Sequence, residues 1–387
     1  MLVTDGEQRV ALAVVRSLGR AGHQPIVCAG SLRSLAGASR YVEYQAVVPS
    51  ALEAPERFVE AVRQVVRERQ AEFVLPLTEA AMLALLPVRA TLGATIPAPE
   101  AESFRRISDK GILFEVAREV GIAVPEQRRV ASADSADWEA VTALGYPLVL
   151  KPARSVAGGL KLSVRHAADE GELRAVRSAL PPEAYPLLAQ RRVVGPGVGI
   201  FLLVWDGETR AVFSHRRIRE KPPAGGVSVY RESIAADPSL VTRSRAMLDR
   251  FDWRGVAMIE YKLDAQTGTP YLMEINGRFW GSLQLAVDAG VDFPALLIAL
   301  AGGERPAPVT RYRTGVRSRW WWGDVDHLLA RLLHTDRELD LPPGTPGRMR
   351  AVLDFLALWR PGDRGEVFRW SDPGPAWRET LNWFRGQ

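Results

Sequence analysis

The feature that most constrains the fold is a pair of strand-like segments joined by a short turn. The sequence predicts strands over about 255–264 and 270–276, and Gly268 supplies the positive φ that such a turn needs. Apolar residues surround the polar positions of both segments, which indicates a largely buried sheet. The polar side chains inside these strands therefore need a specific explanation.

Two carboxylates are expected to face each other across this hairpin. Because side chains alternate faces along a strand, pairing Asp264 with Pro270 places Glu260 opposite Glu274. Facing carboxylates repel each other, and burial makes the repulsion worse. A hard cation such as Mg²⁺, which prefers carboxylates together with substrate phosphates, removes the repulsion, and Asn276 adds an amide oxygen. A surface hairpin with solvated acids is the alternative interpretation.

Length and composition favour an enzyme of two or three domains. The chain has 387 residues with 47% apolar content, and its single cysteine excludes a disulfide framework and a cysteine metal site. No apolar stretch approaches the length of a membrane span, and the N-terminus lacks the pattern of a secretion signal. We therefore expect a cytoplasmic protein without a membrane partner.

The basic charge of the chain raises the question of a nucleic-acid partner. The net charge is +5 and the isoelectric point is near 9.5. The basic residues are nevertheless spread along the chain and mixed with acids, so we expect no nucleic-acid partner. Binding through the Trp- and Arg-rich tail stays as an alternative. Lysine is scarce and occurs only at positions 110, 151, 161, 221 and 262.

Residues 1–107 read as alternating strands and helices, which implies a parallel sheet. Gly-x-Gly-x-x-Gly is missing after the first strand, so a dinucleotide-binding fold in the strict sense is not supported. Loops at the ends of such strands still tend to bind ligands. Asp5, Gly6, Thr78 and Glu79 are therefore candidates for lining a substrate pocket, and a turn or helix cap is the alternative for each.

A lysine closes the short apolar strand predicted over 146–152. Lys151 is followed by a loop with Gly158 and Gly159, and residues 160–164 are expected to form the returning strand. Glycines let backbone amides approach phosphates, and lysine adds a positive charge. The spacing of a Walker A loop is missing. The pattern therefore favours a phosphate site of another kind.

A basic stretch precedes the acidic hairpin. Five of the seven residues over 215–221 are basic, and residues 219–233 are expected to form a loop that contains Gly225 and Gly226. Arg217 and Arg219 share a face if this stretch is extended. We favour binding of an anionic substrate or phosphate here over a solvated basic face.

The run from Glu274 to Ser282, Glu-Ile-Asn-Gly-Arg-Phe-Trp-Gly-Ser, resembles the metal-binding signature of the ATP-grasp superfamily, in which Glu-x-Asn-x-Arg ends the second strand. Lys110 in Ser-Asp-Lys and Lys151 before its glycine loop are similar to the two nucleotide-binding lysines of that family. The resemblance spans about residues 2–305. It is greatest to carboxylate–amine ligases of the carbamoyl-phosphate-synthase-like and D-alanine–D-alanine-ligase-like kind.

This resemblance implies an α/β fold of the α+β grasp type in three parts. A Rossmann-like pre-ATP-grasp domain would cover 1–107. A two-part ATP-grasp domain would cover 108–305 and bind nucleotide between two antiparallel sheets, with a mobile small subdomain at about 125–192. A Trp/Arg-rich C-terminal extension would cover 306–387.

The resemblance also implies roles for individual residues. The metal ligands would be Glu260, Glu274 and Asn276. The nucleotide would be bound by Lys110, Lys151, Ser155, Gly158, Gly159, Gln190, Arg192 and Val193. The catalytic residues would be Arg278, Lys151 and Arg217, with Arg278 on the transferring phosphoryl group or the acyl phosphate. Many members carry an acid near position 197 for the ribose, and Gly197-Val198-Gly199 departs from that pattern.

We expect substrate contacts from residues near the hairpin that carry a charge or offer free backbone N–H groups. Ser282 begins a predicted helix, and a helix N-terminus attracts anions such as a carboxylate or a developing oxyanion. The candidate substrate residues are Arg219, Gly225, Gly226, Ser282 and Glu79.

The chemistry implied by the resemblance is ligation of a carboxylate to an amine. ATP with Mg²⁺, or with Mn²⁺ as an alternative, would phosphorylate the carboxylate, and the amine would then displace phosphate. The partners would be small-molecule carboxylate and amine substrates, and a homodimer is one candidate for the oligomeric state. An ATP-grasp phosphotransferase, a bicarbonate-using carboxylase and a non-catalytic nucleotide-binding protein are the alternatives.

Overall fold

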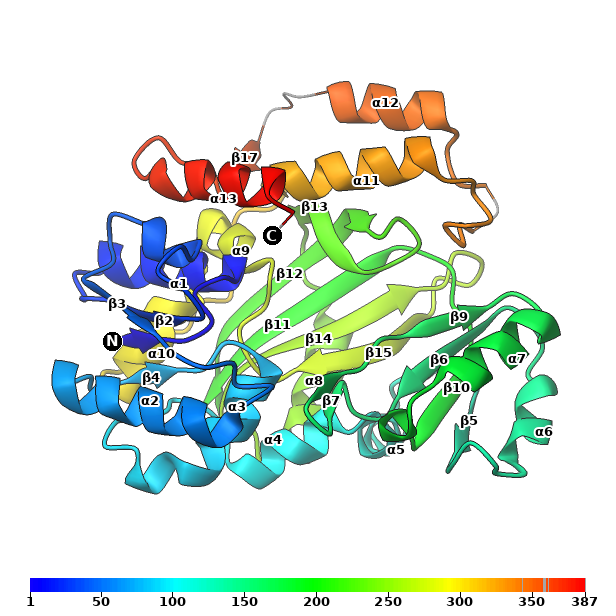
Figure 1. Cartoon of the computed structure of the whole chain (residues 1–387), viewed down its shortest axis with the longest axis horizontal. Helices are drawn as coiled ribbons and strands as arrows, with labels where there is room; N and C mark the ends of the chain where they lie inside the picture. The colour runs from blue at the N-terminus through cyan, green and yellow to red at the C-terminus, as the bar shows by residue number, and fades with distance from the viewer. Residues whose placement is uncertain (343, 358–359, 361, 387) are drawn as a thin grey trace.

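Three main β-sheets organise the chain in the computed structural model, which describes residues 1–342, 344–357, 360 and 362–386 (Figure 1). A parallel N-terminal sheet lies on one side of a large central sheet, and a small antiparallel sheet lies on its other side (Figure 1). The C-terminal helices lie at the top of the view in Figure 1, beside the central sheet. The expected α/β architecture, with two antiparallel sheets after a Rossmann-like layer, is confirmed.

The N-terminal sheet has four short parallel strands. Its elements are β1 (Leu2–Val3), α1 (Arg9–Arg20), β2 (Ile26–Ala29), β3 (Tyr44–Val47), α2 (Pro55–Arg69) and β4 (Val74–Leu75). The strand order is β3-β2-β1-β4, so β1 lies in the interior of the sheet. Helix α1 is buried over most of its length, and it packs against helices of the large domain. This contact joins the N-terminal layer to the rest of the molecule.

Short polar side chains start the helices that follow. Thr78 Oγ1 accepts a hydrogen bond from the backbone N–H of Ala81 at 3.1 Å and donates one to Asp5 Oδ1 at 2.9 Å. These two pocket candidates therefore act as a helix cap and its partner. Asp109 caps the helix that begins at Lys110, because its side chain accepts hydrogen bonds from the backbone N–H groups of Gly111 and Ile112. The elements are α3 (Glu79–Leu85), α4 (Ala101–Ser108) and α5 (Lys110–Glu119).

The small lobe is a four-stranded antiparallel sheet packed against two helices. Its elements are β5 (Gln127–Val130), α6 (Asp137–Thr142), β6 (Leu148–Pro152), β7 (Val156–Ala157), β8 (Leu160–Lys161), β9 (Arg165–Ala167), α7 (Glu170–Ala179) and β10 (Leu187–Arg191). The prediction of a returning strand over 160–164 is wrong, because β7 and β8 form their own ribbon and β9 pairs with β6. Gly158 and Gly159 both have positive φ, which turns the chain back within the ribbon.

The central sheet has seven strands in the order β15-β14-β11-β12-β13-β16-β17. They are β11 (Gly197–Trp205), β12 (Glu208–Lys221), β13 (Val227–Ser233), β14 (Gly255–Leu263), β15 (Pro270–Asn276), β16 (Arg317–Arg319) and β17 (Asp363–Gly365). The predicted loop over 219–233 is wrong, because β12 and β13 continue into it from both sides. Its charges pair across the strands: Arg216 bonds Glu232 at 2.6 Å.

In the β14–β15 hairpin, Glu260 and Glu274 pair as predicted, although the residues nearer the turn pair in a different register. Pro270 lies opposite Leu263 rather than Asp264, which shifts the pairing by one residue. A β-bulge between Glu260 and Tyr261 then absorbs the extra residue Met273, so that Glu260 does lie opposite Glu274. The bulge also turns Met273 toward the same side as the acids.

The glycine-rich run before β11 is required by close backbone contact. A Cβ on Gly195, which has a φ of +153°, would lie 1.7 Å from the carbonyl oxygen of Leu263. A Cβ on Gly197 would lie 2.9 Å from the Arg217 side chain. Larger residues would therefore push away the hairpin and Arg217, which explains why this run carries glycines where the resemblance led us to look for an acid.

We expect Gly195→Ala to lower the free energy of unfolding by about 2 kcal/mol, because the new methyl group clashes with backbone and the φ is strained. Urea unfolding followed by circular dichroism measures the change. Gly207→Ala is the matched control, since Gly207 also has positive φ but a Cβ there has no heavy atom within 4 Å. Equal destabilisation by the two variants would contradict the backbone-contact explanation.

The C-terminal extension is fixed to the body by buried ion pairs. Its elements after β16 are α11 (Trp321–Leu333), α12 (Arg348–Leu356) and α13 (Gly374–Phe384), with β17 between the last two helices. Arg16 Nε of α1 donates to Asp372 Oδ2 at 2.8 Å, and both side chains are only 2% exposed. Arg219 of β12 donates to both carboxylate oxygens of Asp324 at 2.6 Å. The extension is therefore an integral part of the fold.

Three further helices complete the central layer: α8 (Pro238–Asp249), α9 (Leu283–Ala289) and α10 (Phe293–Ala301). Among the described residues, no single helix has the length and apolar character needed to cross a membrane. Helices α9 and α10 meet that criterion only when joined as a pair, and the two are bent by 89°.

Candidate functional site

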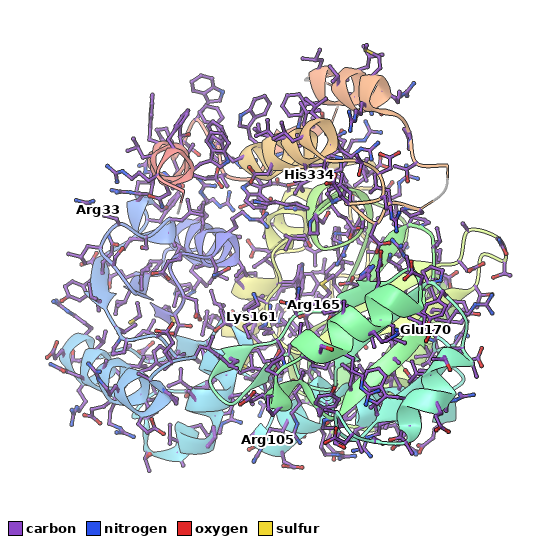
Figure 2. All side chains as sticks on the ribbon, turned by 45° about the vertical axis from the view of Figure 1, so that its right-hand side comes forward. Arg33, Arg105, Lys161, Arg165, Glu170 and His334 are labelled. Atoms are coloured by element: carbon purple, nitrogen blue, oxygen red, sulfur yellow. The ribbon has the colours of Figure 1, made fainter. Side chains whose placement is uncertain are left out.

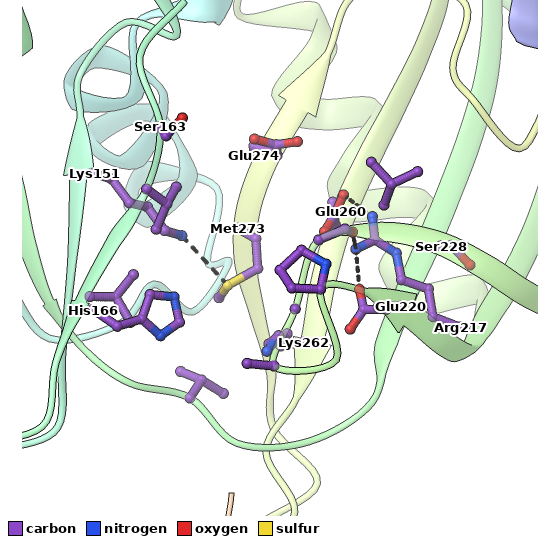
Figure 3. A pocket seen from close by; sticks show the side chains of 18 of the residues that line it. Lys151, Ser163, His166, Arg217, Glu220, Ser228, Glu260, Lys262, Met273 and Glu274 are labelled. Carbon is purple, nitrogen blue, oxygen red and sulfur yellow. Dashed lines mark hydrogen bonds and ion pairs between the residues drawn. The ribbon is translucent and has the colours of Figure 1, made fainter. Parts of the chain in front are cut away.

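A cleft of about 850 Å³ lies where the small lobe faces the β14–β15 hairpin (Figure 3). Four of the five lysines line this cleft, so the scarce lysines are concentrated at one place. The predicted site residues that line it are Lys110, Lys151, Gln190, Arg192, Val193, Arg217, Gly225, Gly226, Glu260, Glu274, Asn276, Arg278 and Ser282. The fold thus brings the metal, nucleotide and substrate candidates together.

Glu260 and Glu274 lie directly opposite each other, and an arginine partly neutralises them. Arg217 forms an ion pair with Glu260 and also donates to Glu220 Oε1 at 2.6 Å (Figure 3). Sequence reasoning about the hairpin alone missed this compensation, because Arg217 comes from β12 and reaches the acid across β11. Burial raises the pKa of Glu260 above its ordinary value, and Arg217 opposes that rise.

Positive groups and an amide hold Glu274 in its charged form. Its Oε1 accepts a hydrogen bond from the Asn276 amide at 3.0 Å, and Asn276 Oδ1 accepts one from Arg278 at 3.2 Å. Burial alone would raise the pKa of Glu274, but Lys110, Asn276 and Lys151 keep it below its ordinary value. The acid is therefore ionised at neutral pH and available to a cation.

The donor set fits a divalent cation that brings ligands of its own. Within the described ranges, no group of three or more His, Cys, Asp or Glu side chains is arranged as a metal site. Two carboxylates and one amide oxygen would leave the other coordination positions to phosphate oxygens and water, which is the usual situation for Mg²⁺. The chain thus fits a metal carried in with a nucleotide better than a closed protein cage.

Lys151 and Lys110 approach the acids from the other side of the cleft. Lys151 Nζ lies 3.9 Å from the sulfur of Met273, the residue displaced by the bulge (Figure 3). Desolvation lowers the pKa of Lys151 to about 8, although Glu274 attracts its proton. Lys110 Nζ donates to Ser155 Oγ at 2.9 Å, so Ser155 supports a cleft residue without lining the cleft itself.

The far end of the cleft, around β10, holds the residues expected to read adenine. Gln190 is buried and its amide donates to Gln127 Oε1 at 2.6 Å. Arg192 donates to the carboxylate and the carbonyl of Asp340, both at 2.7 Å. Asp340 also bonds His166 on β9 and lines the cleft. The C-terminal extension therefore supplies part of this wall, which no sequence motif had indicated.

Four predicted residues lie outside the cleft wall in addition to Ser155. Gly158 and Gly159 form the exposed turn of the β7–β8 ribbon. Two register shifts between Arg217 and Glu220 break the common face expected for Arg217 and Arg219, and Arg219 binds Asp324 instead. Glu79 is the first residue of α3 and lies near Lys110 and Arg278. Burial raises the pKa of Glu79 above its ordinary value, and these two positive groups oppose the rise.

Several cleft residues had not been singled out from the sequence. Lys161, Lys262, Glu220 and His166 all line the cleft. The lysine scarcity was a usable signal for the first two. His215 also lines it, and among the described residues neither of its ring nitrogens has a hydrogen-bond partner. Burial and two nearby arginines hold the pKa of His215 well below its ordinary value, so the ring is neutral.

Part of the chain matches a known protein family, and longer stretches are similar to individual enzymes. Residues 183–322 match the family described as "ATP-grasp in the biosynthetic pathway with Ter operon". The chain is 24% identical over 333 residues to the carbamoyl phosphate synthase large chain of Rubrobacter xylanophilus, an alignment that covers 78% of this chain and 30% of that protein. It is 28% identical over 232 residues to the D-alanine–D-alanine ligase of Albidiferax ferrireducens, covering 52% of this chain and 65% of the ligase. The chain thus spans less than two thirds of the length of either relative.

Solved structures share the fold. The L-amino acid ligase from Bacillus licheniformis matches with a TM-score of 0.61 and 20% identity, over 77% of this chain and 72% of that one. The biotin carboxylase domain of 2-oxoglutarate carboxylase from Hydrogenobacter thermophilus, a domain dimer solved with MgADP, ADP and bicarbonate, matches with a TM-score of 0.64 and 16% identity, over 82% of this chain and 73% of that one. The family match over residues 183–322 and the shared fold agree with the resemblance of the Glu274–Ser282 run to the ATP-grasp signature.

Proposed function

We propose that the protein is an ATP- and Mg²⁺-dependent ligase that joins a carboxylate to an amine through an acyl phosphate and releases ADP and phosphate. The observation that carries this proposal is the convergence of Glu260 and Glu274 with Lys151 and Arg278 in one cleft. The similarity to a D-alanine–D-alanine ligase and to the fold of an L-amino acid ligase supports it.

In this proposal the two strands of the hairpin hold the metal. Glu260, Glu274 and Asn276 are its ligands, and a bound Mg²⁺ would neutralise charge on the transferring phosphate. When the metal is bound, Arg217 no longer needs to balance Glu260 alone and can turn toward an anionic substrate. Arg278, which donates a hydrogen bond to Asn276 Oδ1, would contact the phosphoryl group.

The lysines and the small lobe would bind the nucleotide. Lys110 and Lys151 bring positive charge from two elements, α5 and β6, to the phosphate end of the cleft. Gln190, Arg192 and Val193 at the end of β10 would contact the base. Closure of the small lobe would exclude water, which an acyl phosphate requires because it hydrolyses readily.

The substrate carboxylate would lie between the glycine turn after β12 and the start of α9. Gly225 and Gly226 offer backbone N–H groups, and Ser282 offers a hydroxyl at a helix N-terminus. We also propose the domain division given by the sequence, with a Rossmann-like domain over 1–107, the ATP-grasp domain over 108–305 and the extension over 306–387. The N-terminal domain would contribute Glu79 to the substrate side.

The test is a screen of amino acids and amines, paired with carboxylic acids, for ATP-dependent release of phosphate. We expect stoichiometric ADP, phosphate and amide with at least one pair, and dependence on Mg²⁺. Release stimulated by bicarbonate with a carboxylated product would instead support the carboxylase alternative. A stable phosphorylated product would support a phosphotransferase.

We expect the affinity for ATP to fall roughly tenfold between about pH 7 and about pH 9. With a pKa of about 8, the Lys151 ammonium loses its proton over this range, and the neutral amine attracts phosphate much less. Phosphate favours the charged form, so ATP binding takes up a proton near pH 8. Calorimetric titration at the two pH values measures both effects. Lys151→Arg stays charged, and a decline as steep in this variant would refute the assignment to Lys151.

A further inference from the structure

A second cleft, of about 1220 Å³, lies between the N-terminal layer and the C-terminal extension. Its walls come from the start of α1, the loop after β2, the turn between β12 and β13, Trp320, Trp322 and the inner face of α13. Arg33 stands at its exposed rim, close to α13 (Figure 2). None of the residues assigned to nucleotide, metal or substrate lines this second cleft.

The two clefts share a wall. Pro222 and Val227, at the two ends of the turn between β12 and β13, line both of them. Gly225 and Gly226 lie in the same turn and line the first cleft. This turn therefore lies between the second cleft and the proposed acyl-phosphate site.

The inner face of α13 presents hydrogen-bond acceptors that the protein leaves underused. Glu379 and Asn382 are three residues apart and so lie on one face of the helix. Glu379 Oε1 accepts a hydrogen bond from the indole N–H of Trp320 at 2.7 Å. The buried Asn382 Oδ1 has no hydrogen-bond partner among the described residues. Such a pair of acceptors favours a ligand that brings N–H donors.

The charges in the second cleft favour a cationic ligand over an anionic one. Two of the three basic residues that line it are already paired, Arg9 with Glu366 at 2.7 Å and Lys221 with Asp326, and the third, Arg33, is exposed at the rim. Burial raises the pKa of Glu379 to about 7; Glu366 adds to the rise, while the Trp320 hydrogen bond, Arg9 and Arg16 oppose it. A carboxyl group whose charge is disfavoured in this way gains most from a cation that it can contact directly.

Aromatic rings give the second cleft an apolar wall. Trp322 and Trp383 stack with ring centroids 4.2 Å apart, and their N–H groups are held by Thr380 and Asp326 at 3.1 Å and 2.9 Å. The rings are therefore fixed in orientation and present apolar surface to the cleft. An apolar or aromatic body fits against such a wall, and the faces of the rings also attract a cation.

We propose that this second cleft binds the amine substrate, a primary amine with an apolar or aromatic body, through Glu379, Asn382 and the Trp322–Trp383 pair. This inference rests on the proposed ligase function and assigns one of its two substrates to the C-terminal extension. The amine nitrogen contacts the acceptors of α13 when the amine first binds. It then moves to the acyl phosphate after giving its proton to solvent. There the neutral amine forms the C–N bond as the acyl C–O bond breaks, and the released phosphate takes up the second proton.

The test compares two probes that share one body and differ in charge. Calorimetric titration of the full chain with 2-phenylethylamine should show binding, and 3-phenylpropionate should bind at least about tenfold more weakly. Glu379→Gln keeps the shape and an acceptor for Trp320 but removes the charge, and it should weaken 2-phenylethylamine about tenfold. Asn382→Ala is a second variant that does not depend on that charge. Glu115→Gln, an exposed site on α5, is the matched control and should change nothing.

The outcomes separate this inference from the ligase proposal. Lys151→Ala should abolish ATP binding and leave the affinity for 2-phenylethylamine within about twofold. The amine site is refuted if neither probe binds or if both probes bind equally. It is also refuted if Glu379→Gln and Asn382→Ala both bind 2-phenylethylamine like the wild type. Each of these results refutes the amine site even when ligase activity is present. If the amine binds as expected while the amine screen yields no ATP-dependent product, the ligase function fails and the amine site stands.

Discussion

Glu274→Gln is expected to lower ATP-dependent phosphate release at least about 100-fold. The variant keeps the shape of the side chain but removes one of the two carboxylates proposed to hold the metal. A metal ion typically contributes several kcal/mol to phosphoryl transfer, and each 1.36 kcal/mol corresponds to a factor of ten in rate. Steady-state phosphate release with the best substrate pair measures the loss.

The same variant separates a metal role from a purely structural one. Because Lys110 and Lys151 hold Glu274 in its charged form, the metal-free Glu274→Gln protein should unfold at the same or a slightly lower urea concentration, a change much smaller than the loss of rate. Raising the Mg²⁺ concentration should recover part of the rate, since the weakened site fills at higher metal concentration. Glu115→Gln provides the matched exposed control. Near wild-type release by Glu274→Gln would refute the proposed metal site.

The second large effect is expected at the base of the C-terminal extension. Asp372→Ala should lower the free energy of unfolding by about 3 to 5 kcal/mol, because it leaves the buried Arg16 guanidinium without its carboxylate. Asp372 also accepts hydrogen bonds from Ser39 Oγ at 2.7 Å and from the Arg40 backbone N–H at 2.9 Å. Urea unfolding followed by tryptophan fluorescence measures the loss.

The exposed Asp134→Ala is the control for this prediction and should change the unfolding midpoint little. A double variant, Arg16→Met with Asp372→Leu, should recover part of the stability, because it removes both buried charges together. If Asp372→Ala unfolds like the control, the ion pair is not what fixes the extension to α1.

The central part of the site could be predicted because its signals are local in sequence. Glu274, Asn276 and Arg278 lie within five consecutive residues. Alternation predicted the pair of Glu274 with Glu260, although in the structure that pair depends on the β-bulge at Met273. Lys151 was recognisable because an apolar strand ends there. In each case a short run of residues determines which face a side chain occupies.

The rest of the site depends on contacts between distant segments, which periodicity does not reveal. The β-bulge at Met273 and the register shifts after Arg217 change side-chain directions without a distinct sequence pattern. The strands over 219–233 were missed because their charges have partners that are distant in sequence. Glu232 pairs with Arg216 across the sheet, whereas Arg219 and Lys221 pair with acids of α11. Asp340 was missed because its partner Arg192 lies 148 residues earlier in the chain.

The contacts of Asp340 bear on the lobe closure proposed above, because they connect the C-terminal extension to the small lobe. Its carboxylate is shared by Arg192, where the small lobe joins the body, and by His166 on the outer strand of that lobe. In the lobe closure proposed above, an outward swing of the lobe would move His166 relative to the body, and one of the two bonds of Asp340 would break. We therefore expect the C-terminal extension, through Asp340, to influence how readily a nucleotide enters the cleft.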